Sequence, residues 1–337
     1  MNVSPIKEIA RRGIGAFAPA LWSLRRTPSL VILAYHRVLP SDHPDRAFEQ
    51  PGMFVSPESF QMHVRELLRH FEVVDLSDWV VRVRNVKSVP ARACAITLDD
   101  GWKDNFEYAF PILKQERCPS TIFLVADRIG STYRFWPNRL ARILRQIDRA
   151  ANEPPPQLAE CLGRVGIDVS RIGDGLRMAE IDAAISACKA VSDETLERLL
   201  CEWVGDLQSS ELDRDILNRQ ELEEMRASQL VRFGSHTRRH TRLRDGLSND
   251  VLEDEIGGSR QCLEQLLGEP VDLFCYPNGD MFAGAVEVVR RNYAAAVTTA
   301  LGWNRPSGDL HMLRRISVHE DVAAGANSFL AKLAAIF

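Results

Sequence analysis

Short apolar runs recur along most of the chain, and amphipathic stretches with helical spacing separate them. One such helix is predicted where Ser56 and Pro57 precede an apolar stripe at Phe60, Val64 and Leu67. Strands that alternate with helices are typical of a parallel β/α fold, and about eight strands suit a closed barrel. The candidate strands are residues 31–38, 72–76, 93–98, 120–126, 230–233, 271–275, 294–298 and 313–318.

The pattern changes between residues 134 and 226, where no β-rich run occurs and apolar residues recur at helical spacing. We predict a helical insertion between two barrel strands. Its Phe135-Trp136-Pro137 would either offer an aromatic platform to a sugar ring or pack in a core. The predicted organisation is an N-terminal amphipathic segment (1–29), a barrel (30–133 and 227–322), the helical insertion (134–226) and a C-terminal helix (323–337).

The first 29 residues contain an apolar stretch at 13–24 between two arginine pairs. This stretch is too short for a transmembrane helix, and its apolar core is too short for a signal peptide. Two interpretations stay open. The segment is either an amphipathic helix on an anionic membrane surface or a helix that packs against the barrel.

The composition of the chain limits the classes of molecule that it is expected to bind. The 337 residues carry 42 Lys and Arg against 46 Asp and Glu, a net charge of -4, so no basic excess indicates nucleic acid. A small or carbohydrate substrate is expected instead. The seven cysteines show no C-x-x-C pair, which is typical of reduced thiols in a cytoplasmic protein.

Two adjacent carboxylates, Asp99 and Asp100, follow an apolar strand and precede Gly101. Neighbouring strand residues face opposite sides, so one carboxylate could bind a metal while the other acts as a base. A plain surface turn is the alternative. Downstream, His236 and His240 are four residues apart, and one helical turn would place both imidazoles on one face. Two histidines and a carboxylate suit a hydrolytic divalent metal site.

These motifs give the chain a family resemblance. Residues 97–101 read Thr-Leu-Asp-Asp-Gly, residues 235–240 read Ser-His-Thr-Arg-Arg-His, and residues 275–279 read Cys-Tyr-Pro-Asn-Gly. They resemble, the third only partly, the T-F-D-D-G, S-H-T-x-x-H and R-P-P-Y-G motifs of the polysaccharide deacetylases. That family is defined by the NodB homology domain and grouped as carbohydrate esterase family 4. The resemblance spans roughly residues 30–130 and 230–320 and implies a distorted (β/α) barrel.

The resemblance also implies a set of roles. Asp100, His236 and His240 would hold a divalent metal, with zinc expected first and cobalt, nickel, manganese or iron as alternatives. Asp99 would be the base for an attacking water. A backbone N–H near Asn278 would stabilise the oxyanion.

Two catalytic roles are less directly matched. Cys275 replaces the third-motif arginine that orients the base, and Arg315, or its neighbour Arg314, is our candidate substitute. The family's L-x-H motif supplies a general acid, for which His319 is the candidate and His311 the rival. Each of these side chains has a structural role as its alternative.

Several residues are candidates for contact with the substrate. His36 ends the first strand and would either line the site or make structural hydrogen bonds. Trp303 would either wall the acetyl pocket or pack in the domain. The loop after the candidate strand 271–275 supplies the remaining candidates, which are Tyr276, Pro277, Asn278 and Gly279. A simple turn is the alternative for this loop.

The predicted function is metal-dependent removal of an N-acetyl group from an amino sugar in a cell-surface polysaccharide or its lipid-linked or nucleotide-linked precursor. Two alternatives stay open: a hydrolase of an O-acetyl or N-formyl group, and an inactive carbohydrate-binding relative. The expected partner is an N-acetylated carbohydrate. The expected location is the cytoplasm, with peripheral contact at the inner face of the cytoplasmic membrane or with a lipid-linked glycan.

Overall fold

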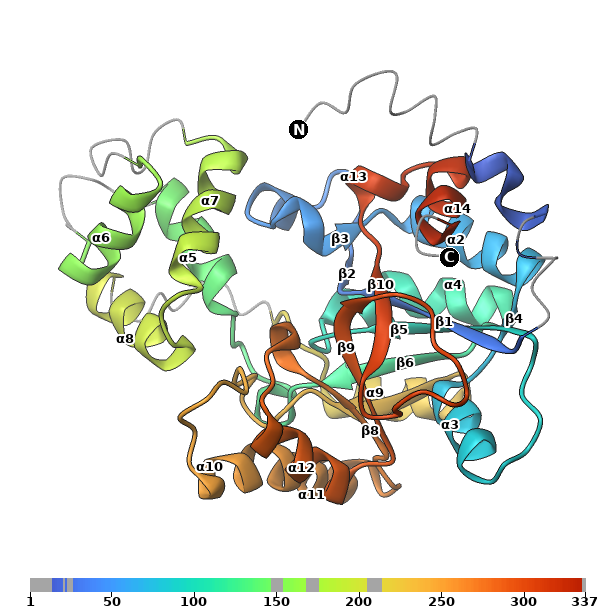
Figure 1. Cartoon of the computed structure of the whole chain (residues 1–337). Helices are drawn as coiled ribbons and strands as arrows, with labels where there is room; N and C mark the ends of the chain where they lie inside the picture. Colours follow the sequence, from blue (N-terminus) through green and yellow to red (C-terminus); the bar gives the residue numbers. More distant parts are fainter. Residues whose placement is uncertain are drawn as a thin grey trace. The chain divides into compact units, whose positions relative to one another are not determined.

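Eight parallel strands form the central sheet of the computed structural model, which describes residues 14–20, 22, 27–146, 154–167, 176–204 and 214–334 (Figure 1). Seven of them close a barrel, because β1 pairs with β10 on one side and with β5 on the other. The strands are β1 (Ser29–Tyr35), β4 (Glu72–Val73), β5 (Arg92–Leu98), β6 (Ser120–Leu124), β7 (Val231–Ser235), β8 (Leu273–Cys275), β9 (Ala295–Leu301) and β10 (Leu313–Ser317).

The eight predicted strands all form, but the eighth does not close the barrel. β4 has two residues and pairs only with Ala93 and Cys94, at the start of β5. The later residues of β5, Thr97 and Leu98, pair with β6 instead. A strand this short leaves room for β6 on the same edge, so the barrel closes with seven strands.

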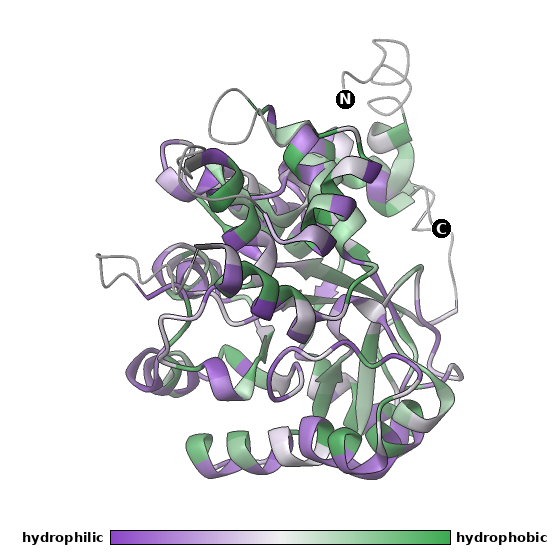
Figure 2. Ribbon diagram, turned by 90° about the vertical axis from the view of Figure 1, so that its left-hand side faces the viewer, coloured by the Kyte–Doolittle hydropathy of each residue, from purple (hydrophilic) through white to green (hydrophobic). Residues whose placement is uncertain are grey.

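Alternating residues of the strands pack on two sides, which explains the nearly continuous apolar runs. Leu30 of β1 and Ala93 of β5 belong to one buried cluster with Phe123, and we assign this cluster to the barrel interior. Val31 and Cys94 belong to a second cluster, which contains the apolar faces of the surrounding helices. Figure 2 shows the strands largely in green and the helices striped in green and purple.

The helices around the barrel begin and end as their sequences indicate. Ser56, for example, caps α2 by accepting a hydrogen bond from the Ser59 N–H at 3.1 Å. Two of the helical stretches contain a π-helical turn, at Asn105–Ala109 before α4 and at Asp254–Gly258 between α10 and α11. The barrel helices are α2 (Pro57–His70), α3 (Leu76–Arg84), α4 (Phe110–Glu116), α9 (Arg219–Ala227), α10 (Asn249–Glu253), α11 (Ser259–Leu267), α12 (Ala283–Asn292), α13 (Glu320–Ala323) and α14 (Ala326–Ala334).

A second compact unit comprises residues 41–50 and 132–215 and has its own apolar core. Trp136 is buried in that core and donates from Nε1 to Asp193 at 2.9 Å, so its indole packs internally. The unit ends at residue 215, not at 226 as predicted, because Leu222 of α9 is buried in the barrel's outer core. Its helices are α5 (Trp136–Gln146), α6 (Pro156–Arg164), α7 (Met178–Cys188) and α8 (Asp193–Val204).

The barrel segments that flank this insertion are hydrogen-bonded to each other. The N–H of Gly130 donates to the carbonyl of Leu217 at 2.8 Å. The N–H of Leu217 in turn donates to the carbonyl of Gly101 at 2.9 Å, and Ile216 forms a β-bridge with Trp102. The insertion therefore leaves and rejoins the barrel at the Asp-Asp-Gly loop.

Part of the N-terminal segment packs against the barrel. Residues 14–20 are helical, and Ala18 and Trp22 are buried in the barrel's outer core. A Cβ added at Gly15 would lie 2.0 Å from the carbonyl oxygen of Asn327, so the helix contacts α14 closely. Phe17 on the same helix is 70% exposed. No helix in the described ranges is both long enough and apolar enough to span a bilayer.

Candidate metal centre at the barrel mouth

The polar candidates gather at one end of the barrel because of the strand alternation. Every second residue of a strand faces the interior, as Leu30, Ala93 and Leu313 do on β1, β5 and β10 and as Gly234 of β7 does beside Phe123. Continuing this alternation by one or two residues beyond each strand brings His36, Asp99, His236 and His319 to the interior side. Carboxyl ends of parallel strands all lie at the same end of a barrel, where catalytic groups belong. The same alternation of strand residues is present in the sequence.

Asp100 and the two histidines form a group of potential metal ligands. The Oδ1 atom of Asp100 lies 3.4 Å from Nε2 of His236 and 3.4 Å from Nε2 of His240. Burial alone would raise the pKa of Asp100, but the hydrogen bond from His236 and the charge of His240 hold it well below its ordinary value. The carboxylate therefore stays ionised, as a ligand must be.

The histidine pair does not lie on a helical turn, and that prediction was wrong. Residues 236–244 form a loop, in which Thr237 and His240 adopt positive φ angles of 62° and 68°. These left-handed residues reverse the chain, and the two imidazole centroids lie 4.9 Å apart. Ser235, which directly precedes the pair, shares a hydrogen bond with Ser259 at 2.7 Å.

The protonation of His236 is set by its second ring nitrogen. Nδ1 lies 2.8 Å from the carbonyl oxygen of Cys275, which can only accept, so Nδ1 carries the proton. Nε2, which faces Asp100 and donates to it in the metal-free protein, is then the ring atom that would give up its proton to bind a metal. The three ligand atoms lie within 4.8 Å of one another, and one carboxylate oxygen with two imidazole nitrogens is a donor set that fits zinc or a similar divalent ion.

Asp99 does not join this ligand group but pairs with Arg315. The guanidinium makes a bidentate contact, with Nη1–Oδ1 at 2.7 Å and Nη2–Oδ2 at 2.8 Å, and both side chains are buried. Burial alone would raise the pKa of Asp99, yet the charge of Arg315 brings it below its ordinary value. The neighbouring Arg314 points away and donates to the carbonyl of Leu301.

Cys275 lies against this pair. Its thiol is 3.6 Å from Oδ2 of Asp99 and 3.1 Å from Nη2 of Arg315, and burial raises its pKa. The structure therefore places an arginine from β10 on the carboxylate, where the family motif would have supplied one from the Cys275 position on β8.

The two general-acid candidates lie at opposite ends of the barrel. His319 follows β10, and its buried Nδ1 has no hydrogen-bond partner in the part of the chain that the structure describes. His311 precedes β10, and its Nε2 bonds the carbonyl of Tyr293 at 2.9 Å, away from the metal ligands. Nε2 of His36 lies 3.9 Å from Asp99, so this histidine faces the site together with His319.

The residues of the loop 276–279 differ in their exposure to solvent. Tyr276 is fully buried, and its hydroxyl donates to the His311 carbonyl at 3.3 Å, so its side chain belongs to the core and not to a substrate surface. Pro277 is buried as well, whereas Asn278 is exposed with φ of 57°. Gly279 has a φ of 75°, and a Cβ there would meet Thr299 at 1.9 Å, so only glycine fits.

Trp303 is also remote from the metal ligands. Its Nε1 donates to the carbonyl of Leu333 at 3.2 Å, and its ring packs near Trp22 and Phe71. The reason is that the chain doubles back after β9, and Asn304 bridges to Leu30 near the start of β1. Trp303 thus lies toward the amino ends of the strands and cannot wall an acetyl pocket.

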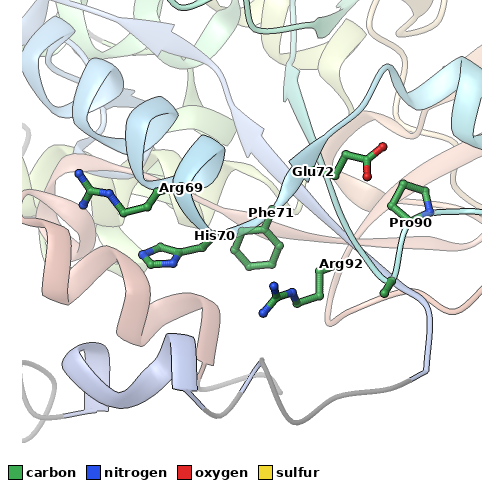
Figure 3. Close-up of a pocket in the computed structure, with 7 residues that line it drawn as sticks. Arg69, His70, Phe71, Glu72, Pro90 and Arg92 are labelled. Atoms are coloured by element: carbon green, nitrogen blue, oxygen red, sulfur yellow. The ribbon is translucent and has the colours of Figure 1, made fainter.

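A cavity of about 310 Å³ lies at that same end of the barrel (Figure 3). It is formed by the end of α2, the start of β4 and the first residue of β5, and Arg69 on its wall is already paired with Glu66. Because these strands only begin here, the cavity is separate from the metal ligands at their carboxyl ends. Its lining residues are Arg69, His70, Phe71, Glu72, Pro90, Ala91 and Arg92.

Two residues that support the ligands were not predicted. The indole Nε1 of Trp102 donates to Oδ2 of Asp100 at 3.0 Å. The buried Glu255, presented by the π-helical turn, accepts the backbone N–H groups of Arg238 and Arg239 at 3.1 and 3.0 Å. Only Trp102 had a signal in the sequence, its place beside the Asp-Asp-Gly motif.

We expect Glu255→Gln to weaken zinc binding about tenfold, because both N–H groups that hold the loop between the histidines depend on this carboxylate. Competition of the metal-free protein with a chelator measures the effect. Glu253→Gln is the matched control, since Glu253 is exposed on the adjoining α10 and pairs with Arg291. Equal affinities for the two variants would contradict the expectation.

The fold and this site together define a class: a seven-stranded parallel (β/α) barrel with an Asp-His-His group and a separate Arg-paired aspartate at its mouth. The model of the family described as polysaccharide deacetylase matches residues 86–169 and 193–297, more than half of the chain. The chain belongs to the polysaccharide deacetylase family.

Individual relatives are distant. YxkH of Bacillus subtilis (strain 168), which bears the provisional name of a polysaccharide deacetylase, is 25% identical over 111 residues; the match spans 32% of this chain and 37% of that relative. The Streptococcus pyogenes deacetylase PplD, solved with acetate, has a TM-score of 0.59 and 17% identity, covering 91% of this chain and 99% of that one. IcaB from Ammonifex degensii has a TM-score of 0.57 and 18% identity, covering 91% and 98%. At these identities the structures support the fold alone, a NodB-type barrel.

Proposed function

We propose that this protein is a metal-dependent N-deacetylase of an amino sugar. Its family supports hydrolysis of a carbohydrate amide. The observation that carries the proposal is the division of labour between adjacent aspartates: Asp100 faces two imidazoles, whereas Asp99 is held by Arg315 a few ångströms away. One carboxylate is thus arranged as a ligand and the other as a base.

Asp100, His236 and His240 would hold the metal, which when bound acts as a Lewis acid toward the acetyl oxygen and the attacking water. The base is Asp99, whose lowered pKa keeps it ionised and able to accept the proton of that water. Arg315 holds both of its oxygens in place, so the carboxylate does not turn toward the cationic ligand group.

Two further groups complete the reaction. The exposed Asn278 lies in a loop at the carboxyl end of β8, where its backbone N–H could donate to the developing oxyanion. His319, at the carboxyl end of β10, would protonate the departing amine, so that acetate and a free amino sugar are released. His36 lies beside Asp99 and would contact the sugar or its acetyl group.

Metal removal and restoration tests this function. We expect metal-stripped protein to release no acetate, and protein restored with zinc or cobalt to release it from at least one of a panel of N-acetylated glycans, lipid-linked sugars and nucleotide sugars. Acetate release that is unaffected by chelation would contradict the metal requirement. Cleavage of O-acetyl or N-formyl sugars alone would favour a different carbohydrate hydrolase.

An inactive carbohydrate-binding relative is the second candidate, and the loss of the third-motif arginine at Cys275 favours it. The Asp99–Arg315 pair speaks against it, because a binding protein has no need for an oriented base. Glycan binding with metal bound but with no hydrolysis of any panel member would decide for this candidate.

We also propose that the enzyme acts in the cytoplasm on lipid-linked or nucleotide-linked precursors, with peripheral contact at the membrane. The support is the exposed Phe17 on a helix whose flanks carry basic pairs in the sequence. Fractionation should find the full-length protein in the cytoplasm and at the inner membrane face. Recovery only outside the cytoplasmic membrane would overturn this location.

A further inference from the structure

The indole of Trp102 touches the candidate ligand Asp100, and the proposed reaction does not use it. Trp102 is 1% exposed, and its Nε1 donates to Oδ2 of the carboxylate at 3.0 Å. The other oxygen, Oδ1, is the one that lies 3.4 Å from both histidine Nε2 atoms. The two oxygens of one carboxylate therefore have different partners.

The indole is held in place from its other side. The guanidinium of Arg37 lies 4.2 Å from the centroid of the Trp102 ring, a cation–π contact away from water. Arg37 is itself fixed by Asp104, with Nε–Oδ2 at 2.8 Å, and both of these side chains are buried.

The backbone is fixed as well. Trp102 forms a β-bridge with Ile216, and Asp104 accepts the Val38 N–H at 2.8 Å, so the segment after Gly101 is tied to two other parts of the barrel. An indole that is stacked on one side and bonded through its only donor cannot readily turn away from Asp100.

We propose that Trp102 is a positioning residue that reserves one oxygen of Asp100 for the metal. A carboxylate without such a partner can bind a metal through one or both oxygens. Occupying Oδ2 limits Asp100 to Oδ1 and leaves other coordination positions open for substrate and water. This inference rests on the proposed metal function, and it concerns how the ligand is presented.

The test is Trp102→Phe, which keeps an aromatic ring for Arg37 and removes only the N–H donor and part of the ring. Metal-free protein is titrated with zinc, and separately with cobalt(II) so that its visible absorption reports the coordination. We expect zinc affinity to fall about tenfold, because Asp100 loses the hydrogen bond that orients it. The cobalt spectrum should differ from that of the wild type, because the second oxygen becomes free to bind.

Trp79→Phe is the matched control. Trp79 is equally buried, but it lies on α3 and belongs to the interior cluster near the amino ends of the strands. A folded Trp102→Phe with wild-type affinity and cobalt spectrum would overturn the inference alone. An equal change in Trp79→Phe would overturn it too, since the effect would then be general. A wild-type chain that binds no metal would overturn the proposed function together with it.

Discussion

Arg315→Met is expected to lower kcat for acetate release about 100-fold or more, toward the level of Asp99→Asn. The bidentate contact that orients the base is lost, and a positioned general base contributes about 10²–10⁴-fold. KM should change less, because Arg315 is buried beneath the base and would not meet the sugar. Steady-state kinetics on the best substrate of the panel measures both constants.

The pH profile separates an orienting role from a merely structural one. Burial raises the pKa of Asp99 and Arg315 is the main group that lowers it, so removal of the guanidinium leaves burial opposed only by the charges of His236 and His36. Since the base must be ionised, the acid limb of kcat/KM should move to higher pH in Arg315→Met. An unmoved acid limb with lower activity would argue against the proposed role.

Controls for this variant are available in the chain. Arg314→Met changes the adjacent residue, whose exposed side chain donates to the Leu301 carbonyl away from Asp99, and we expect near wild-type kinetics. Removing one partner of a buried ion pair costs about 3–5 kcal/mol of stability, so Arg315→Lys serves as a milder variant in case the methionine variant does not fold. Lysine keeps the charge but not the bidentate geometry, and should recover part of kcat.

His319→Gln is expected to lower kcat for an N-acetyl substrate about 100-fold and to remove the alkaline limb of the pH profile, because an amine must be protonated as it leaves. The effect should nearly vanish with 4-nitrophenyl acetate, whose leaving group needs no proton. A similar loss on both substrates would argue that His319 has a structural role only.

The pKa of His319 lies below its ordinary value. Burial lowers the pKa of His319, and the positive charge of Lys332 lowers it further. The acid must be protonated, so activity should decline on the alkaline side at a lower pH than a free histidine would give. Lys332→Gln should move this limb to higher pH. His311→Gln is the matched control and should leave both limbs in place, since His311 lies at the other end of β10.

Much of the fold could be predicted because buried parallel strands leave nearly continuous apolar runs. The closure of the barrel by seven strands could not be predicted, because it depends on how far β4 extends along β5. Nothing in the sequence of residues 72–76 shows that only two residues pair. The insertion was placed from its helical spacing, but its end was missed because α9 has the same periodicity while it packs on the barrel.

Some residues of the site could likewise be predicted from the sequence, and others could not. The ligands and the base could be predicted from motifs at strand ends, and Arg315 from its position on the last strand, across the barrel mouth from Asp99. The histidine loop and Trp303 could not be placed, because positive φ angles at Thr237 and His240 and the reversal of the chain near Asn304 are set by tertiary contacts. Glu255 lies in a π-helical turn 17 residues after Arg238, and no local sequence pattern marks it.

The hydrogen bond between Gly130 and Leu217 has a consequence for engineering. The N–H of Gly130 and the carbonyl of Leu217, more than eighty residues apart in sequence, lie 2.8 Å apart, so the segment between them leaves and rejoins the barrel at one joint. Residues 41–50 of the same unit connect to the barrel at a second place. A turn of a few residues could bridge that joint without altering any strand register. Residues 41–50 would have to be exchanged together with this segment, because Glu49 accepts a hydrogen bond from Asn138 of α5. Related deacetylases could then exchange this unit while keeping the barrel that carries the chemistry.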